Sequence, residues 1–576
     1  MKRSKILSLL LAVALVIAAC TPGGGEADAP AADPPADVEA PADDAAPGND
    51  DEAPADTPAG TGQVNPAGTF PIVDVPITVS IFSRHIGWVA DFHDNRFTEW
   101  YQDHTNIIID WQLVSPDDVA TSLNLRLAAG DLPDIFMDPW EVTSSQVRVM
   151  GDAGMIIPLN DLIDRYGIET TRVLDGNPVV RGLITQDDGR ILTLPQVDMC
   201  YHCQFPNKAW VYEPWLLELG LDIPSTTDEF VDMLRAFRDM DPDVVPLTGY
   251  VMGSGFPTIT SFFMNSFIYT DDYNFLKVDN GVLTPVFNTD EWREGLRFLH
   301  SLHEEGLLSN ETFTQDAPTM QALNGGDNIR IAVFPSLVSW GSVPGGTAHE
   351  EWTNYVPLTP LEGPGGVRFA RHRVYEMGAP NAFMISSSNP YPEASFRFAD
   401  ALYDMETMMR KYYGRIDYEI RFAEPGEYGI NGLPAIWTIM TESGNEHDQP
   451  NHAAWAHVGP HYRSADFRHG MTVDGDPRSH PEKVLYLATR HQYEPFAPPS
   501  EIVQPPQTFS ETQASDILDI DLTIRNHVAE MFALFIIGEA CLDNDWDMYL
   551  ATLDGMGLAR FVEIHQAAFD ERWGGR

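Results

Sequence analysis

Short apolar runs and amphipathic stretches alternate at the start of the folded part of the chain. Ile77–Phe82 predicts a strand, Ile107–Leu113 predicts a second strand that is apolar on both faces, and Asp134–Met137 predicts a third. Helix-like spacing fills both connections. The order strand, helix, strand, helix, strand therefore predicts a parallel sheet with right-handed crossovers.

Helices are marked by their ends as well as by their apolar faces. Val119, Leu123 and Leu127 recur at i, i+4 and i+8, which predicts a helix with one buried side. Farther along, Thr226 and Glu229 have the spacing of a capping box at a helix N-terminus. Strands and helices thus alternate through a long globular region, which favours the α/β class.

The first twenty residues have a different pattern. A positively charged head precedes the apolar run Ile6–Ala19, which is too short to span a bilayer, since a spanning helix needs about 20 apolar residues. This order is typical of an export signal. Ile17–Cys20 resembles a bacterial lipobox, in which the cysteine is acylated. We therefore expect residues 1–20 to be a lipoprotein signal peptide, the alternative being an ordinary secretory signal.

The segment after the cysteine has the composition of a tether. Residues 21–76 are dominated by Ala, Pro, Asp, Glu and Gly, with 12 acidic residues and no Lys or Arg. Such a segment cannot bury enough apolar surface to offset chain entropy. With a lipid on Cys20, this disordered tether would hold the protein at the extracellular face of the cytoplasmic membrane.

About 500 residues remain, which suggests two or more lobes. The net charge of the chain is −50, of which the head contributes +3 and the tether −12, so the globular part carries −41. This balance argues against nucleic acid as a partner, because phosphates need basic contacts. No other apolar run reaches membrane-spanning length; Phe532–Ile537 is the most apolar, and flanking glutamates favour a buried helix.

Three cysteines remain after Cys20. Cys200 and Cys203 have Cys-x-x-Cys spacing, and Cys541 stands alone. A single such pair is weak evidence for zinc, so a local disulfide or free thiols are the favoured alternatives.

The residues that follow the first and third predicted strands combine hydrogen-bonding groups with tryptophans. Ligands of open parallel sheets bind beyond the carboxyl ends of the strands. An arginine at such a place has a surface ion pair as its alternative role. We therefore expect ligand contacts from five side chains here: Arg84, His85, Trp88, Asp138 and Trp140.

Several motifs occur in the order found in one known family. They are "LNLRLAAGDLPDIF", "GMIIPLNDLID", "GRILTLPQVD" and "WLLELGLDIPSTTDEF", then the run Ile329–Trp340 and the C-terminal stretch from Phe535. In this order the chain resembles bacterial extracellular solute-binding proteins of family 1, the carbohydrate-binding components of ABC importers. The similarity covers nearly everything from Ile77 onward.

The resemblance implies a type II periplasmic-binding-protein-like fold. In that fold two α/β lobes, with parallel-rich sheets flanked by helices, enclose a ligand cleft and are joined by a hinge of crossing strands. By analogy, residues 77–198 and 378–408 would form lobe 1, and residues 199–377 and 409–576 would form lobe 2. Closure around a sugar would present a surface to the permease.

A sugar ring has an apolar C–H face and a rim of hydroxyls, so its site needs flat aromatic rings and polar side chains. Trp340 follows a predicted strand. Trp437 and Trp455 lie in polar, loop-like sequence, where a large ring has no obvious packing role. We expect these three to contact ligand, with a place in the core as the alternative for any one tryptophan.

Polar candidates lie near the expected crossing between lobes. Gln196 and Asp198 follow the run "ILTLP" and are placed to sense both lobes, with a structural hydrogen bond at the hinge as the alternative. Arg373 can bind two hydroxyls or a carboxylate through its planar fork, with a surface ion pair as the alternative.

Metal sites are weaker predictions. Residues 447–469 hold five histidines, of which His457 and His461 have helical spacing, but Pro460 separates them, so a mobile loop lining the cleft is favoured over a metal site. Many large family members carry a calcium loop near residues 239–243, but here no glycine or closing glutamate follows the alternating aspartates. We therefore expect no metal and no cofactor.

These observations predict a lipid-anchored, monomeric receptor that delivers a sugar or oligosaccharide to the transmembrane subunits of an ABC permease. The chain lacks a Gly-x-Ser-x-Gly elbow, a His-Glu-x-x-His motif and a phosphate loop, so we expect no enzymatic activity. The alternatives are a surface-tethered glycoside hydrolase, which needs two suitably spaced carboxylates, and a receptor for a non-sugar solute such as a peptide.

Overall fold

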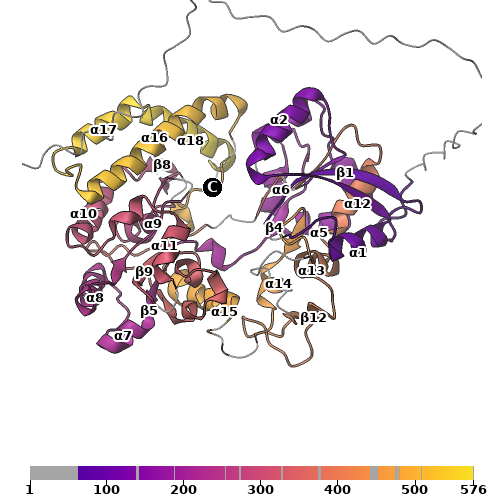
Figure 1. Ribbon diagram of the computed structural model, residues 1–576. Coiled ribbons are helices and arrows are strands. Elements are labelled where there is room, and N and C mark those ends of the chain that lie inside the picture. Colours follow the sequence, from indigo (N-terminus) through magenta and orange to yellow (C-terminus); the bar gives the residue numbers. More distant parts are fainter. Residues whose placement is uncertain are drawn as a thin grey trace, which may run out of the picture. The chain divides into compact units, whose positions relative to one another are not determined.

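Two four-stranded sheets, each with its own hydrophobic core, organise the folded part of the chain (Figure 1). The computed structural model describes residues 63–87, 89–137, 142–186, 188–252, 255–271, 274–325, 328–373, 378–440, 452–473, 476, 478, 480–507 and 509–574.

The first sheet has the strand order β11-β3-β1-β2. Its strands are β1 (Ile77–Arg84), β2 (Ile107–Val114), β3 (Ile135–Met137) and β11 (Phe383–Ile385). β1 pairs in parallel with both β2 and β3, as the sequence predicted, whereas β11 joins β3 antiparallel. Because β11 is distant in the chain from the other three strands, the local sequence pattern did not predict that it joins this sheet.

One detail of this sheet differs from the prediction. β2 was expected to be buried on both faces, but Ile108 is 47 % exposed and Asp110 is exposed, while Ile107 and Ile109 are buried. The reason is position: β2 is the edge strand, and one of its faces meets solvent.

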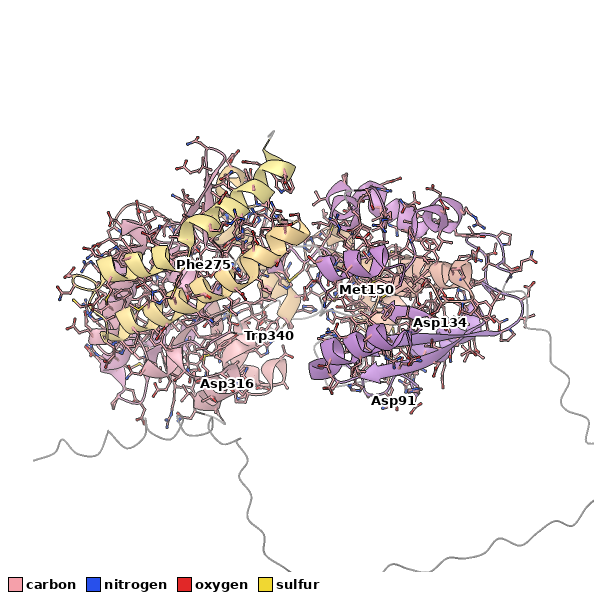
Figure 2. The ribbon with its side chains drawn as sticks, turned by 90° about the horizontal axis from the view of Figure 1, so that it is seen from above. Asp91, Asp134, Met150, Phe275, Asp316 and Trp340 are labelled. Atoms are coloured by element: carbon pink, nitrogen blue, oxygen red, sulfur yellow. A yellow bond between two sulfur atoms is a disulfide. The ribbon has the colours of Figure 1, made fainter. Side chains whose placement is uncertain are left out.

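Asp134, just before β3, ties that strand to β1. One of its carboxylate oxygens accepts from the backbone N–H of Ser80 at 2.8 Å and from the Ser80 hydroxyl at 2.9 Å. In return, the Ser80 hydroxyl oxygen accepts from the Asp134 backbone N–H. Figure 2 shows Asp134 on the purple ribbon of the N-terminal elements. The register of the sheet is therefore fixed by side-chain bonds as well as by the ladder.

The helices α1 (Arg96–Thr105), α2 (Val119–Ala129) and α12 (Pro392–Ala401) belong with this sheet (Figure 1). In α2, Val119 and Leu123 are buried as predicted. The helix ends at Gly130, whose φ of 70° lies in the left-handed region that favours glycine. We call the apolar cluster around these strands, with α1 and α12, the first core.

The second sheet has the order β10-β5-β9-β6. Its strands are β5 (Lys208–Tyr212), β6 (Val245–Leu247), β9 (Ile331–Ser336) and β10 (Tyr355–Leu358). β9 is antiparallel to β5 and parallel to β6. We call the apolar residues packed on its two faces the second core.

Three long helices contribute to the second core: α8 (Thr227–Met240), α10 (Asp290–Glu304) and α16 (Glu511–Ile537). α8 begins with the predicted capping box, since Thr226 and Glu229 each accept from the other's backbone N–H. In α16, Phe532 and Phe535 are buried, as expected for a core helix. Across the part of the chain that the structure describes, no helix combines the length and apolarity that a membrane span requires.

Further helices and strands complete the described fold. The further helices are α3 (Ser144–Asp152), α4 (Asn160–Tyr166), α5 (Glu169–Gly176), α6 (Pro178–Ile184), α7 (Glu213–Leu219), α9 (Ile259–Met264), α11 (Ala317–Gln321), α13 (Met405–Tyr413), α14 (Ala465–His469), α15 (Pro481–Ala488), α17 (Trp546–Gly555) and α18 (Leu558–Trp573). The further strands are β4 (Gln196–Asp198), β7 (Leu276–Asp279), β8 (Val282–Pro285), β12 (Ile420–Phe422), β13 (Trp437–Ile439) and β14 (His461–Arg463).

The chain passes from one core to the other three times. It belongs to the first core up to Val197, to the second from Phe205 to Ala370, to the first again from Phe383 to Val458, and to the second again from Leu485. We call the connecting stretches between these residues the first, second and third passages, in chain order. The sequence had assigned all of 409–576 to the second lobe. That boundary is corrected here, because Trp455 and Val458 are buried in the first core.

The folded region also begins earlier than the expected tether boundary at residue 76. Val64 and Val73 form an antiparallel bridge, and Ile72 and Val73 are buried in the first core. The guanidinium of Arg397, in α12, donates to the carbonyls of Asn65 and Thr69 at 2.6 Å each. The proline-rich composition concealed this small folded segment, whose partner lies more than 300 residues away.

Candidate ligand-binding site

The residues predicted beyond the first sheet lie at the end of β1 or outside the described residues. Arg84 is half-buried and is the last residue of β1, and His85 is exposed, with its ring 6.1 Å from that of Phe92. Trp88, Asp138 and Trp140 lie outside the described residues. Arg84 and His85 therefore stand at the strand end where the sequence placed them.

The crossing between cores is built from two short parallel strands. β4 pairs with β14, which brings Gln196 opposite His461 and Asp198 opposite Arg463. Both strands carry polar side chains into a region between two apolar cores, where each charge must find a partner. Gln196 and Asp198 therefore lie at the crossing, where their partners decide between a ligand contact and a structural role.

Asp198 is held by two buried arginines. One carboxylate oxygen accepts from Arg463 at 3.0 Å and the other from Arg468 at 2.8 Å. Arg468 also reaches Glu482, in α15, at 3.3 Å. The side chains of Asp198, Arg463 and Arg468 are 17 %, 2 % and 8 % exposed. This network joins the first passage to the third.

The charges around Asp198 fix its ionisation. Burial by itself would raise the pKa of this carboxyl, but Arg463 and Arg468 lower the pKa far below its ordinary value. Asp198 is therefore ionised throughout the neutral range and paired on both oxygens. These contacts match the alternative that the sequence left open for this residue, a structural role at the hinge.

Gln196 stands at the end of a buried polar chain. Its Nε2 lies 3.4 Å from Nε2 of His461, and His461 Nδ1 lies 3.0 Å from the ammonium of Lys411. Lys411 is fully buried and donates to the carbonyl of Val458 at 2.6 Å. Burial first, and then Lys411, lower the pKa of His461 well below its ordinary value. The imidazole is therefore neutral and can accept from the lysine.

This arrangement revises the prediction for the histidine segment. His461 begins β14 and is buried, whereas His457 lies in a turn with its ring 2.7 Å from Tyr412 OH, so the segment is partly a strand and not a loop throughout. Their helical spacing has no structural counterpart, because β14 is extended. His447 lies outside the described residues.

Two predicted ligand contacts turn out to have packing roles. Trp437 is buried and stacked on Phe467 at 5.1 Å, and its indole N–H donates to the Phe467 carbonyl at 2.9 Å. Trp455 is fully buried, and its indole N–H donates to the hydroxyl of Thr98 at 2.7 Å. The reason for placing these two rings in a ligand site was therefore wrong, since each completes an apolar cluster.

Trp340 and Arg373 remain partly accessible. Trp340 (Figure 2) is half-buried in a short 3-10 turn after β9. Its ring lies 5.7 Å from that of Trp352. Arg373 is half-buried, and its backbone N–H donates to the carbonyl of Gln204 at 2.7 Å. Both residues are therefore only partly buried.

Sequence reasoning missed the cations of the crossing: Lys411, Arg463 and Arg468. None was singled out, although Arg463 and Arg468 lie within the histidine-rich segment 447–469, and each acquires its role from partners distant in the chain. The one available signal was scarcity, because only 35 of 576 residues are Lys or Arg and 85 are acidic. In such a chain a buried cation needs a specific set of acceptors.

The cysteines fall into one pair and one single residue. Cys200 and Cys203 form a disulfide in the first passage, so the local disulfide is the correct one of the two favoured alternatives, and free thiols are not. Cys541 is exposed and free.

Comparison with known proteins places these features in a family. FusA of Streptococcus pneumoniae, a fructooligosaccharide ABC transporter substrate-binding protein, is 25 % identical over an alignment of 502 residues that covers 84 % of this chain and 88 % of that protein. Its structure in complex with kestose has a TM-score of 0.71 at 22 % identity, covering 87 % of this chain and all of that one.

A second solved structure agrees in fold. It is an HMO-binding, ABC-transporter-associated solute-binding protein from Bifidobacterium longum infantis, with a TM-score of 0.70 at 20 % identity, covering 86 % of this chain and 99 % of that one. The prediction of a type II solute-binding fold is confirmed. The family model described as bacterial extracellular solute-binding protein matches residues 88–409, more than half of the chain. The chain belongs to the bacterial extracellular solute-binding protein family.

Proposed function

We propose that this protein captures an oligosaccharide outside the cell and delivers it, chemically unchanged, to the permease of an ABC importer. The observation that carries the proposal is the similarity to FusA along 84 % of the chain, in addition to membership of the solute-binding family. A match of this extent covers most of the chain and most of the related protein. It argues for a shared mode of action rather than for one borrowed domain.

Side chains at the ends of strands supply suitable chemistry. Trp340 offers an aromatic ring for the C–H face of a sugar, and Arg84 and His85 offer donors for its hydroxyls. Trp88, Asp138, Trp140 and Arg373 remain proposed contacts on the sequence argument. A receptor of this kind works as a monomer that closes on its ligand without breaking a bond.

A ligand screen tests the function. We expect fructo-oligosaccharides or other neutral oligosaccharides to raise the melting temperature of the folded region, and mass spectrometry to recover each sugar intact. Trp340→Ala should weaken binding about tenfold or more, corresponding to about 1.4 kcal/mol or more, with little change in melting temperature without ligand. Shortened sugars would support the glycoside hydrolase, and stabilisation by peptides alone would support a receptor for another solute.

The N-terminus is proposed to anchor the protein. Acylation of Cys20 would keep the receptor beside its permease at high effective concentration, with the acidic segment as a flexible tether. Labelled palmitate supplied to expressing bacteria should enter the wild-type protein and not Cys20→Ser. Equal labelling of the two proteins would refute the anchor.

A further inference from the structure

The first passage between the cores holds a compact group of metal-binding side chains. Cys200 and Cys203 are three residues apart with Cα atoms 5.2 Å apart, and His202 lies between them in the chain. One ring nitrogen of His202 and the two cysteine sulfurs all lie within 4.8 Å of one another. Among the described residues, this is the one such group of three or more His, Cys, Asp or Glu side chains.

Two thiolates and an imidazole are ligands that Zn²⁺ prefers. Zinc–sulfur bonds of about 2.3 Å in a tetrahedron require the sulfurs to lie roughly 3.8 Å apart. The bonded sulfurs are closer than this, so the disulfide must open before a metal can bind. A Cα separation of 5.2 Å leaves the two side chains facing each other after the bond has opened.

A carboxylate stands beside the group. Glu482 Oε2 lies 3.6 Å from His202 Nδ1, and both side chains are about nine-tenths buried. Carboxylate partners of this kind hold a ligating imidazole in one orientation and increase its basicity. Glu482 also pairs with Arg468, so its position is fixed independently of any metal.

The loop is accessible to small molecules on one side. Cys200 is 7 % exposed, whereas Cys203 is half-buried. A disulfide that closes so short a loop also restricts the unfolded chain less than one that closes a long loop. A small reductant can therefore reach the disulfide, and the disulfide contributes only modestly to the stability of the fold.

We propose that Cys200, His202 and Cys203 form a zinc site when the disulfide is reduced. A dithiol reductant passes two electrons to the S–S bond and becomes a disulfide itself, and its two protons pass to the cysteine sulfurs. Zinc binding then displaces these two protons and leaves two thiolate ligands beside the imidazole. The passage between the cores would thus exist in a disulfide state and a metal state.

The test uses the full chain carrying Cys541→Ser, so that only one pair of thiols is present besides Cys20. The protein is reduced with a phosphine, which supplies two electrons while water supplies the oxygen of the phosphine oxide and two protons. We expect the reduced protein to retain one equivalent of Zn²⁺ through gel filtration and the oxidised protein to retain none. Cobalt should give a thiolate-to-metal charge-transfer band that zinc abolishes.

Matched variants test whether zinc is bound by these particular side chains or by thiols in general. Cys200→Ser and Cys203→Ser should each lose the retained zinc, and His202→Gln and Glu482→Gln should each weaken it at least tenfold. Zinc retention by Cys200→Ser equal to that of the parent, or no retention by the reduced parent, would overturn the proposal. Unfolding on reduction alone, seen by circular dichroism, would overturn it as well, because the site requires a folded loop.

Discussion

Asp198→Ala should destabilise the fold by about 3–5 kcal/mol, the range expected when one partner of a buried ion pair is removed. The carboxylate accepts from Arg463 at 3.0 Å and from Arg468 at 2.8 Å, and both guanidiniums are at least nine-tenths buried. Its removal takes one carboxylate partner from each of these two buried guanidiniums. Equilibrium urea unfolding measures the loss.

The matched control is Asp110→Ala on the exposed face of β2, for which we expect a change within about 0.5 kcal/mol.

The stabilisation that Asp198 provides should also depend on pH, and it should decrease only in acid. Because its pKa is depressed in the folded state, its stabilisation is fully present above the unfolded pKa of about 3.9 and is lost as pH falls through the folded pKa. The difference between wild type and Asp198→Ala should therefore be constant from pH 8 to about pH 5 and shrink only in stronger acid. A loss below 1 kcal/mol at neutral pH would contradict the structural role.

Local pattern was sufficient wherever a local rule decides the outcome. The first three strands, the buried side of α2, the capping box at Thr226 and the core helix α16 all followed from periodicity or end signals. Each depends on residues within a few positions of one another. The family motifs then gave the type II fold, which no local rule could supply.

Long-range partners account for what the sequence did not reveal. Ile72 looked like part of a tether, but it is buried in the first core, and Arg397 donates to the carbonyl of nearby Thr69. Ile108 looked buried because only the sheet order makes β2 an edge. At the crossing, Asp198 was correctly singled out, but its arginines come from positions 265 and 270 residues away.

Trp455 shows the same limit at a single residue. Its neighbours in sequence are small or polar, so it resembled a ligand contact on a loop. In the structure its ring meets Phe97 at 4.7 Å and Trp111 at 5.1 Å, both edge to face. These rings come from α1 and β2, and the hydroxyl of Thr98 accepts its indole N–H. Trp455 therefore joins the third stretch of the chain to the first core.

Trp455→Ala should accordingly lower the free energy of unfolding by about 3–5 kcal/mol, the cost of a large cavity in a packed core, increased by the lost hydrogen bond to Thr98. Trp455→Phe should cost less, because it keeps part of the ring volume. Urea unfolding gives both values, and titration with a bound oligosaccharide should show unchanged affinity for Trp455→Phe. Trp340→Ala is the control. Because that ring is half-buried and is proposed to contact ligand, its loss should weaken binding and change the stability little. If Trp455→Phe instead lost affinity while keeping its stability, the indole would act on the ligand, and its assignment to the core would be wrong.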